Sequence, residues 1–201
     1  MANIVLMADI IGSSKRAGKE LMMQFKQLTD SVKRKHTKRF LSPITITLGD
    51  EFQSVVKSVE DAMAVVVELE EKIIELNFEF KLRYSIYEGE IDTPINKEVA
   101  YGMLGEALTK ARATLDDMKS KKYERFFISL IDKKQAEIIQ NYFLLYISFI
   151  DAWKASDYPL VYAFIDKDNY REVAKIFDKD DSQMWKRNKS LHIREYLAIR
   201  N

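Results

Sequence analysis

The chain has 201 residues, of which 47% are hydrophobic and 31% are charged, enough apolar surface for one core with a small appended module. Its net charge of +1 excludes a uniformly basic surface, so a nucleic acid would contact one face only. The absence of cysteine excludes disulfides, thiol catalysis and thiolate metal sites. No apolar stretch approaches the roughly 18 residues that span a bilayer, so we expect a cytoplasmic protein with no membrane partner.

The first predicted element is a strand over residues 4–8, a continuously apolar run typical of a strand buried on both faces. It ends at Asp9, so the carboxylate of this residue is expected at the carboxyl end of the strand. After a short turn, apolar residues at helical spacing predict a helix that extends to about His36.

The middle of the chain predicts further strands and helices. Pro43 precedes a strand over residues 44–48, and Gly49-Asp50 is a typical two-residue hairpin turn. The hydrophobic patterns then predict a strand at 52–56, a helix at 59–76, a strand at 78–87, a helix at 104–118 and a strand at 126–131. This order predicts an α/β (α+β) sandwich of the ferredoxin-like type over residues 1–132, with helices on one face of a mainly antiparallel sheet.

Residues 133–201 are expected to form a helical C-terminal module. Three helical runs, at 158–165, 170–177 and 182–197, are separated by polar turns of a length that suits a helix-turn-helix. Ser182 is the predicted cap of the recognition helix, and the predicted DNA-binding residues on that helix are Gln183, Lys186, Arg187 and Lys189.

The charge of this last segment is consistent with a nucleic-acid partner, because residues 182–200 contain five basic residues and one acidic residue. The alternative is a helical hairpin that packs on the core or forms a dimer, with its basic residues solvated.

Two carboxylates near turns form the candidate metal site. Magnesium prefers oxygen ligands and usually retains waters, so two carboxylates suffice together with nucleotide phosphates. We predict Asp9, Asp50 and the backbone carbonyl of Ile10 as the ligands. Because successive strand residues face opposite sides, Glu51 is expected to face away from Asp9. The alternative is structural, since Gly-Asp turns are common and an Asp at a strand end often binds its own backbone.

The turn after the first strand is the candidate phosphate site. It lies directly before a helix, whose free backbone N–H groups and positive dipole end suit an anion. The predicted phosphate-binding residues are Gly12, Ser13, Ser14 and Lys15.

These residues resemble the catalytic core of class III nucleotidyl cyclases, in which Asp-Ile ends the first strand and a Gly-Asp hairpin supplies the second metal-binding Asp. Asp9-Ile10 and Gly49-Asp50 stand in those places, and residues 83–91 and 101–107 resemble two further cyclase segments. With its helical tail, the chain is most similar to the SatD family, which joins such a core to a helix-turn-helix. The resemblance implies Mg or Mn, a nucleoside triphosphate and a homodimer, because cyclase sites form between two subunits.

The chain departs from the cyclase pattern at the positions that carry catalysis and base recognition. The helix that should carry the catalytic Asn has none, and Lys110 and Arg112 are the remaining candidate catalytic cations, which would neutralise phosphate charge. Ile46 replaces the Lys of adenine-specific cyclases.

We therefore expect a Mg-nucleotide-binding regulatory protein with a DNA-binding tail. One alternative is an active nucleotidyl cyclase, which would convert a nucleoside triphosphate into a cyclic nucleotide and pyrophosphate and use its tail for assembly. Another is a pseudo-enzyme scaffold.

Overall fold

The computed structural model describes residues 2–13, 18–120 and 125–200 and confirms the predicted α+β fold class. The chain forms two compact units, one of residues 1–69 and 80–140 and the other of residues 70–79 and 141–201. The division falls within two helices, α2 (Val59–Glu75) and α4 (Lys133–Ala152), whereas the sequence places its boundary at the beginning of α4. Among the described residues, none of the helices combines the length and the hydrophobicity of a membrane span.

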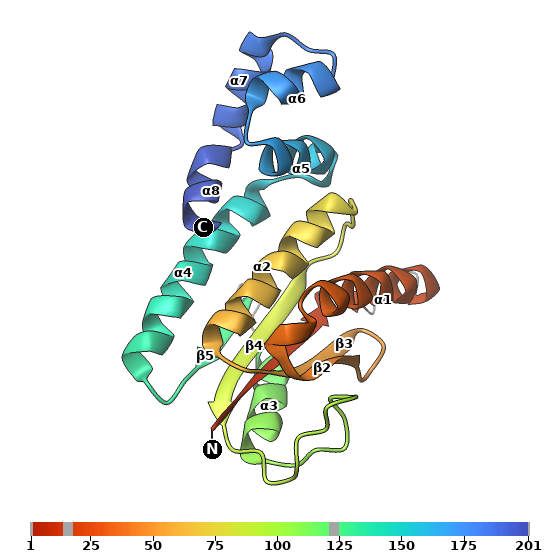
Figure 1. The fold of residues 1–201 in the computed structure, drawn as a ribbon, viewed down its shortest axis with the longest axis vertical. Coiled ribbons are helices and arrows are strands. Elements are labelled where there is room, and N and C mark those ends of the chain that lie inside the picture. Colours follow the sequence, from red (N-terminus) through yellow and green to blue (C-terminus); the bar gives the residue numbers. More distant parts are fainter. Residues whose placement is uncertain (1, 14–17, 121–124, 201) are drawn as a thin grey trace. The chain divides into compact units, whose positions relative to one another are not determined.

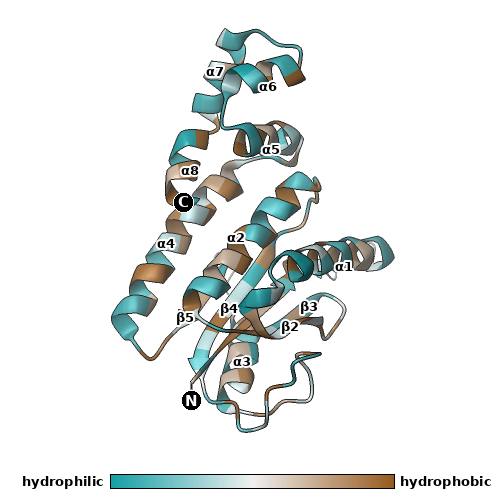
Figure 2. Ribbon diagram, viewed as in Figure 1, coloured by the Kyte–Doolittle hydropathy of each residue, from teal (hydrophilic) through white to brown (hydrophobic). Residues whose placement is uncertain are grey.

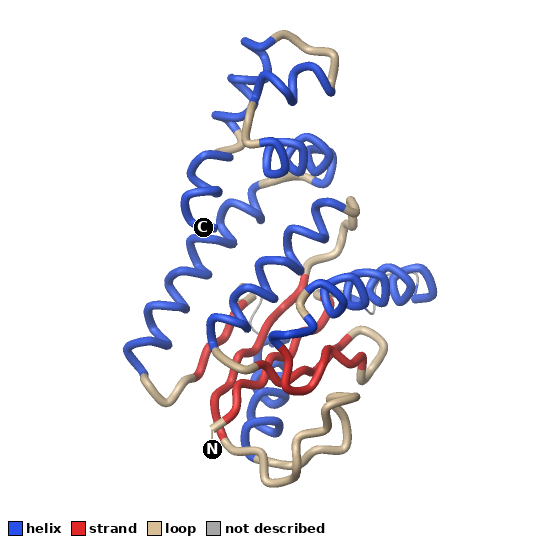
Figure 3. The backbone as a smooth tube through the Cα atoms, in the orientation of Figure 1, coloured by secondary structure: helices blue, strands red, loops and turns tan. Residues whose placement is uncertain are grey.

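A five-stranded sheet organises the first unit (Figure 3). Its strands are β1 (Asn3–Ile10), β2 (Phe40–Ile46), β3 (Glu51–Val56), β4 (Leu82–Gly89) and β5 (Phe126–Ser129). They lie in the order β2-β3-β1-β4-β5, and all neighbours are antiparallel except β4 and β5. The apolar strand β1 therefore lies at the centre, buried by its neighbours as its sequence predicts.

Helices cover both faces of this sheet (Figure 1). On one face lies α1 (Gly18–Lys35), whose Phe25 stacks on Phe52 of β3. On the other lies α3 (Glu106–Ser120), which packs against Val5 and Met7 of β1. The expectation that helices occupy one face only was wrong. The small side chains of α3 that enter this core, Ala107 and Ala111, favour close packing on the second face.

Several predicted boundaries shift. The turn before β3 spans residues 47–50, with Gly49 at φ +80°, so it is longer than the two-residue turn expected. β4 begins at Leu82 rather than at residue 78, and α3 begins at Glu106 because Gly105 adopts φ +155°. A side chain at Gly105 would approach the Glu90 carbonyl oxygen to 2.6 Å, so this position requires glycine.

The second unit is helical. Besides the end of α2 and most of α4, it contains α5 (Tyr158–Lys167), α6 (Tyr170–Ile176), α7 (Asp181–Ser190) and α8 (Ile193–Arg200). The single helix expected over 182–197 is thus two helices, and Asp180, not Ser182, is the N-cap. The chain breaks at His192, which has φ +53°, beside Leu191, whose carbonyl accepts the indole N–H of Trp153 at 2.8 Å.

Candidate functional site

Asp9 is at the centre of the candidate site, near the carboxyl end of β1. It pairs with Glu51 of β3 on one side and with Arg83 of β4 on the other. Residues directly opposite in antiparallel strands project to the same face, here the face covered by α3. Asp9 and Glu51 are each 3% exposed and Arg83 is 8% exposed, so two acids and a guanidinium are buried together.

Two cations are paired with the Asp9 carboxylate. Arg83 Nη1 lies 3.2 Å from Asp9 Oδ2, and Lys119 Nζ, from the last turn of α3, lies 3.7 Å from the same oxygen. Burial raises the pKa of Asp9, the charges of Arg83 and Lys119 oppose this, and those of Asp50 and Glu51 add to it. The net direction is upward, so further positive charge next to Asp9 would favour its ionised form.

Glu51 is the second buried acid of this cluster. Arg112 Nη2 lies 2.7 Å from Glu51 Oε1, and the Thr47 hydroxyl donates a hydrogen bond to the same oxygen at 3.1 Å. The expectation that Glu51 faces away from Asp9 was wrong. Glu51 is the first residue of β3 and is the direct register partner of Asp9. Asp50 lies in the preceding turn, where the alternation of a strand does not apply.

The two turns at this end of the sheet are joined by hydrogen bonds. Ser13 Oγ donates to Asp50 Oδ2 at 2.5 Å, and the Ile10 N–H donates to the Asp50 carbonyl at 3.0 Å. Gly12 adopts φ +73°, which glycine tolerates best. The structure therefore brings four predicted site residues together with Asp9, namely Ile10, Gly12, Ser13 and Asp50. The predicted phosphate-binding residues Ser14 and Lys15 lie outside the described residues.

The two predicted catalytic cations are in different places. Arg112 contacts the buried acid Glu51 and also lines a cavity of about 280 Å³ with Gln53 and Thr109. Lys110 instead lies 2.6 Å from Glu106 on the exposed side of α3, and its hydrogen bond to Glu106 raises the Lys110 pKa. Of this pair, Arg112 reaches the carboxylates and Lys110 does not.

The donor set of the site suits a cation that is shared with an anionic ligand. Within the described ranges, no three histidine or acidic side chains form a ready set of metal ligands. Mg²⁺ usually takes one or two carboxylates and completes its shell with water and phosphate oxygens. Asp9 and Asp50 meet that smaller requirement, with Glu51 beside them.

Three members of the cluster were not predicted as functional, namely Glu51, Arg83 and Lys119. Arg83 had a signal, because it is a cationic residue in a segment that resembles a cyclase strand. Lys119 had none, since nothing in the last turn of α3 indicates contact with Asp9 more than a hundred residues earlier.

The candidate DNA-binding surface is the hydrophilic helix α7 (Figure 2). Gln183, Lys186 and Lys189 are exposed and three residues apart, so they share one face. Arg187 does not project freely, because its Nη2 lies 2.6 Å from Asp157 Oδ1. Trp185 of the same helix is 45% exposed, and Lys189 Nζ lies 4.2 Å from its ring centroid.

The sequence matches the model of the SatD family over residues 3–201. No curated protein matches it.

Solved structures similar to the chain include nucleotidyl cyclases. A bacterial light-regulated adenylyl cyclase is 11% identical, with a TM-score of 0.48 over 64% of this chain and 43% of that one. An adenylate/guanylate cyclase/hydrolase from Silicibacter pomeroyi is 16% identical, with a TM-score of 0.45 over 59% of this chain and 70% of that one. The guanylyl cyclase Cya2 is 18% identical, with a TM-score of 0.42 over 64% of this chain and 75% of that one. The chain thus spans less than half of the first of these structures.

Proposed function

The chain belongs to the SatD family, and we propose that its sheet unit binds a nucleoside triphosphate together with Mg²⁺ or Mn²⁺. The observation that carries the proposal is the buried set of Asp9, Glu51 and Arg83 at the end of the central strand, with Asp50 in the adjoining turn. Burying charged groups is costly even when they are paired, and carboxylates whose pKa is perturbed by burial are typical of functional sites.

The proposed binding is an exchange of ion pairs. The metal would be held by Asp9, Asp50 and the Ile10 carbonyl, and bound metal would supply charge neutralisation for the phosphates. The phosphate oxygens would take over Arg83, Arg112 and Lys119, which now face Asp9 and Glu51. Arg83 Nε is buried without a hydrogen-bond partner among the described residues, and an added oxygen would satisfy it.

This exchange predicts that metal and nucleotide bind together. Mg²⁺ alone must displace cations already paired with Asp9 and Glu51, and triphosphate alone must displace the acids from the same cations. Either ligand alone should therefore bind more weakly, by at least about tenfold, than it does in the presence of the other, a coupling of about 1.4 kcal/mol.

The test is calorimetric titration of the four nucleoside triphosphates with and without Mg²⁺, in wild type, Asp9→Asn and Asp50→Asn. We expect one or more nucleotides to bind only with Mg²⁺, and each variant to weaken binding at least about tenfold. Asp92→Asn, an exposed carboxylate of the loop between β4 and α3, is the matched control and should bind as wild type does. Equal binding by wild type and both site variants would contradict the proposal.

Turnover as a nucleotidyl cyclase is the alternative for the same site. Arg112, which pairs with Glu51, would face a phosphate, whereas Lys110 is paired with Glu106 away from the carboxylates. Mg²⁺-dependent pyrophosphate release that is lost in Asp50→Asn would support it. Binding without release would leave a nucleotide-responsive regulator.

The helical unit is proposed to bind double-stranded DNA, so that the chain would act as a nucleotide-responsive regulator. The supporting observation is the exposed face of α7 with Gln183, Lys186 and Lys189. Lys186→Glu with Lys189→Glu should abolish salt-sensitive retention on duplex DNA, whereas the control Lys154→Glu, outside α7, should retain it. Equal retention by both variants would exclude this surface.

A homodimer is the last part of the proposal. It rests on the resemblance to cyclases, whose sites form between two subunits, and on the paired half-sites that helix-turn-helix proteins favour. Light scattering at several protein concentrations would test it, and a constant monomer mass would contradict it.

A further inference from the structure

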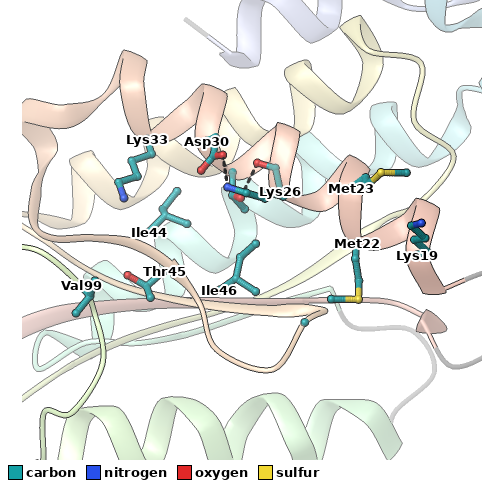
Figure 4. Close-up of a pocket in the computed structure, with 12 residues that line it drawn as sticks. Lys19, Met22, Met23, Lys26, Asp30, Lys33, Ile44, Thr45, Ile46 and Val99 are labelled. Carbon is teal, nitrogen blue, oxygen red and sulfur yellow. Dashed lines mark hydrogen bonds and ion pairs between the residues drawn. The ribbon is translucent and has the colours of Figure 1, made fainter.

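A second cavity lies on the opposite face of the sheet from Asp9, between α1 and the edge strand β2 (Figure 4). Its volume is about 580 Å³, within the range of small-molecule pockets in proteins. None of the residues proposed above for metal or phosphate lines it; the residue nearest to them is Gly49, at the hairpin tip. It is therefore a separate site.

The floor and one wall of this cavity are apolar. Ile44 and Ile46 point from β2 toward α1, and Met22 points from α1 toward β2 (Figure 4). Met22 is 54% exposed and its neighbour Met23 is 59% exposed. Methionine adapts to irregular apolar shapes, so these side chains suit a flat or flexible apolar ligand.

Three lysines border the same cavity along α1, namely Lys19, Lys26 and Lys33. They are seven residues apart, so they lie on one side of the helix at intervals of about 10.5 Å. Lys26 is paired with Asp30 at 2.7 Å. Lys19 and Lys33, at opposite ends of the cavity, form no ion pair with any described residue, which leaves two ammonium groups for a ligand.

We propose that this cavity, the α1–β2 groove, binds a small amphipathic organic anion. The apolar body of the ligand would lie on Ile44, Ile46 and Met22, and its carboxylate, phosphate or sulfonate would pair with Lys19 or Lys33. Charge complementarity selects an anion, and the cavity volume selects a small molecule rather than a protein. The site is independent of the metal-nucleotide site, so either can exist without the other.

Two fluorescent probes with the same apolar body separate the apolar contact from the charge pairing. The first is 8-anilino-1-naphthalenesulfonate, which carries one negative charge, and the second is N-phenyl-1-naphthylamine, which lacks the sulfonate. We expect the sulfonate probe to bind saturably, one per chain, and at least about tenfold more tightly than the neutral probe. Equal affinity for the two probes, or a stoichiometry well above one, would overturn the proposal.

Variants then place the probe in the groove. Lys19→Gln with Lys33→Gln should lower the affinity for the sulfonate probe to that of the neutral probe and leave the neutral probe unchanged. Lys38→Gln with Lys57→Gln removes two exposed lysines elsewhere on the same unit and should change neither. Met22→Glu, at an exposed position that tolerates a polar side chain, should weaken both probes. Unchanged affinity for the sulfonate probe in both Lys19→Gln with Lys33→Gln and Met22→Glu would overturn the assignment to this groove.

A membrane surface is the competing partner, because lysines and exposed methionines on one helix also suit anionic lipid. Co-sedimentation with phosphatidylserine vesicles tests this. Sedimentation that depends on Lys19 and Lys33 would overturn the small-molecule assignment, whereas a protein that stays in the supernatant and binds the soluble probe supports it.

Discussion

Each unit of the chain buries a polar cluster, but the two clusters differ in kind. In the sheet unit, Asp9 and Glu51 face Arg83, Arg112 and Lys119, so ionised groups are held against one another. In the helical unit, the Tyr146 and Tyr196 hydroxyls lie 3.2 Å apart, and Tyr196 donates to Glu71 at 2.8 Å.

The two clusters differ in how far their own members satisfy one another. Burial raises the pKa of both tyrosines, so they stay neutral, and their hydrogen bonds are made within the cluster. Such a network fixes packing. The sheet cluster instead raises the pKa of a carboxylate despite two adjacent cations and leaves Arg83 Nε unpaired among the described residues. It has unused capacity to bind a ligand, whereas the tyrosine cluster has little.

The largest expected effect is the loss of Arg83. Arg83→Met would leave Asp9 buried without its nearest cation, and we expect the free energy of unfolding to fall by about 3 kcal/mol at neutral pH. Urea unfolding followed by far-ultraviolet circular dichroism measures it. Asp9→Asn added to Arg83→Met removes the unpaired charge and should recover most of the loss. A double variant as unstable as the single one would show that Arg83 contributes by packing.

The tyrosine cluster should give a smaller effect. Tyr196→Phe removes the hydroxyl between Tyr146 and Glu71 while keeping the ring, and should lower stability by about 1.5 kcal/mol. Both tryptophans lie in the helical unit, so their fluorescence reports its unfolding. The control is Tyr170→Phe, whose hydroxyl has an exposed hydrogen bond to Arg171. Equal midpoints for the two variants would contradict the role assigned to the cluster.

The smallest expected effect is that of Asp9→Asn alone, and its sign depends on pH. Because burial raises the folded pKa of Asp9, the stabilisation tied to its protonated form is present below the unfolded pKa and is lost as pH rises through the folded pKa. Asp9→Asn does not titrate, so its stability relative to wild type should increase with pH across that window.

Unfolding of both proteins at several pH values between 4 and 8 measures this difference. A constant difference would show that burial does not perturb Asp9. The same linkage predicts that Mg²⁺-nucleotide binding by wild type strengthens as pH rises through the folded pKa, because the metal requires the ionised carboxylate.

Elements with local sequence signals were predicted correctly. The apolar run before Asp9 identified the central strand, and the helical spacing of Leu21, Phe25, Leu28 and Val32 identified α1. The Gly-Asp turn placed Asp50 at a hairpin, and motif resemblance identified the SatD family. These signals survive because burial periodicity and turn chemistry act over a few residues.

Which side chains meet in the site depends on strand register and helix packing. Strand register places Glu51 beside Asp9 on the same face of the sheet. The packing of α3 brings Arg112 and Lys119 to these acids, whereas Lys110 stays outside the cluster. The break at His192 likewise lies next to a tertiary hydrogen bond, from Trp153 to the Leu191 carbonyl. Register and packing are fixed by the summed burial of many distant residues, so no local pattern encodes them.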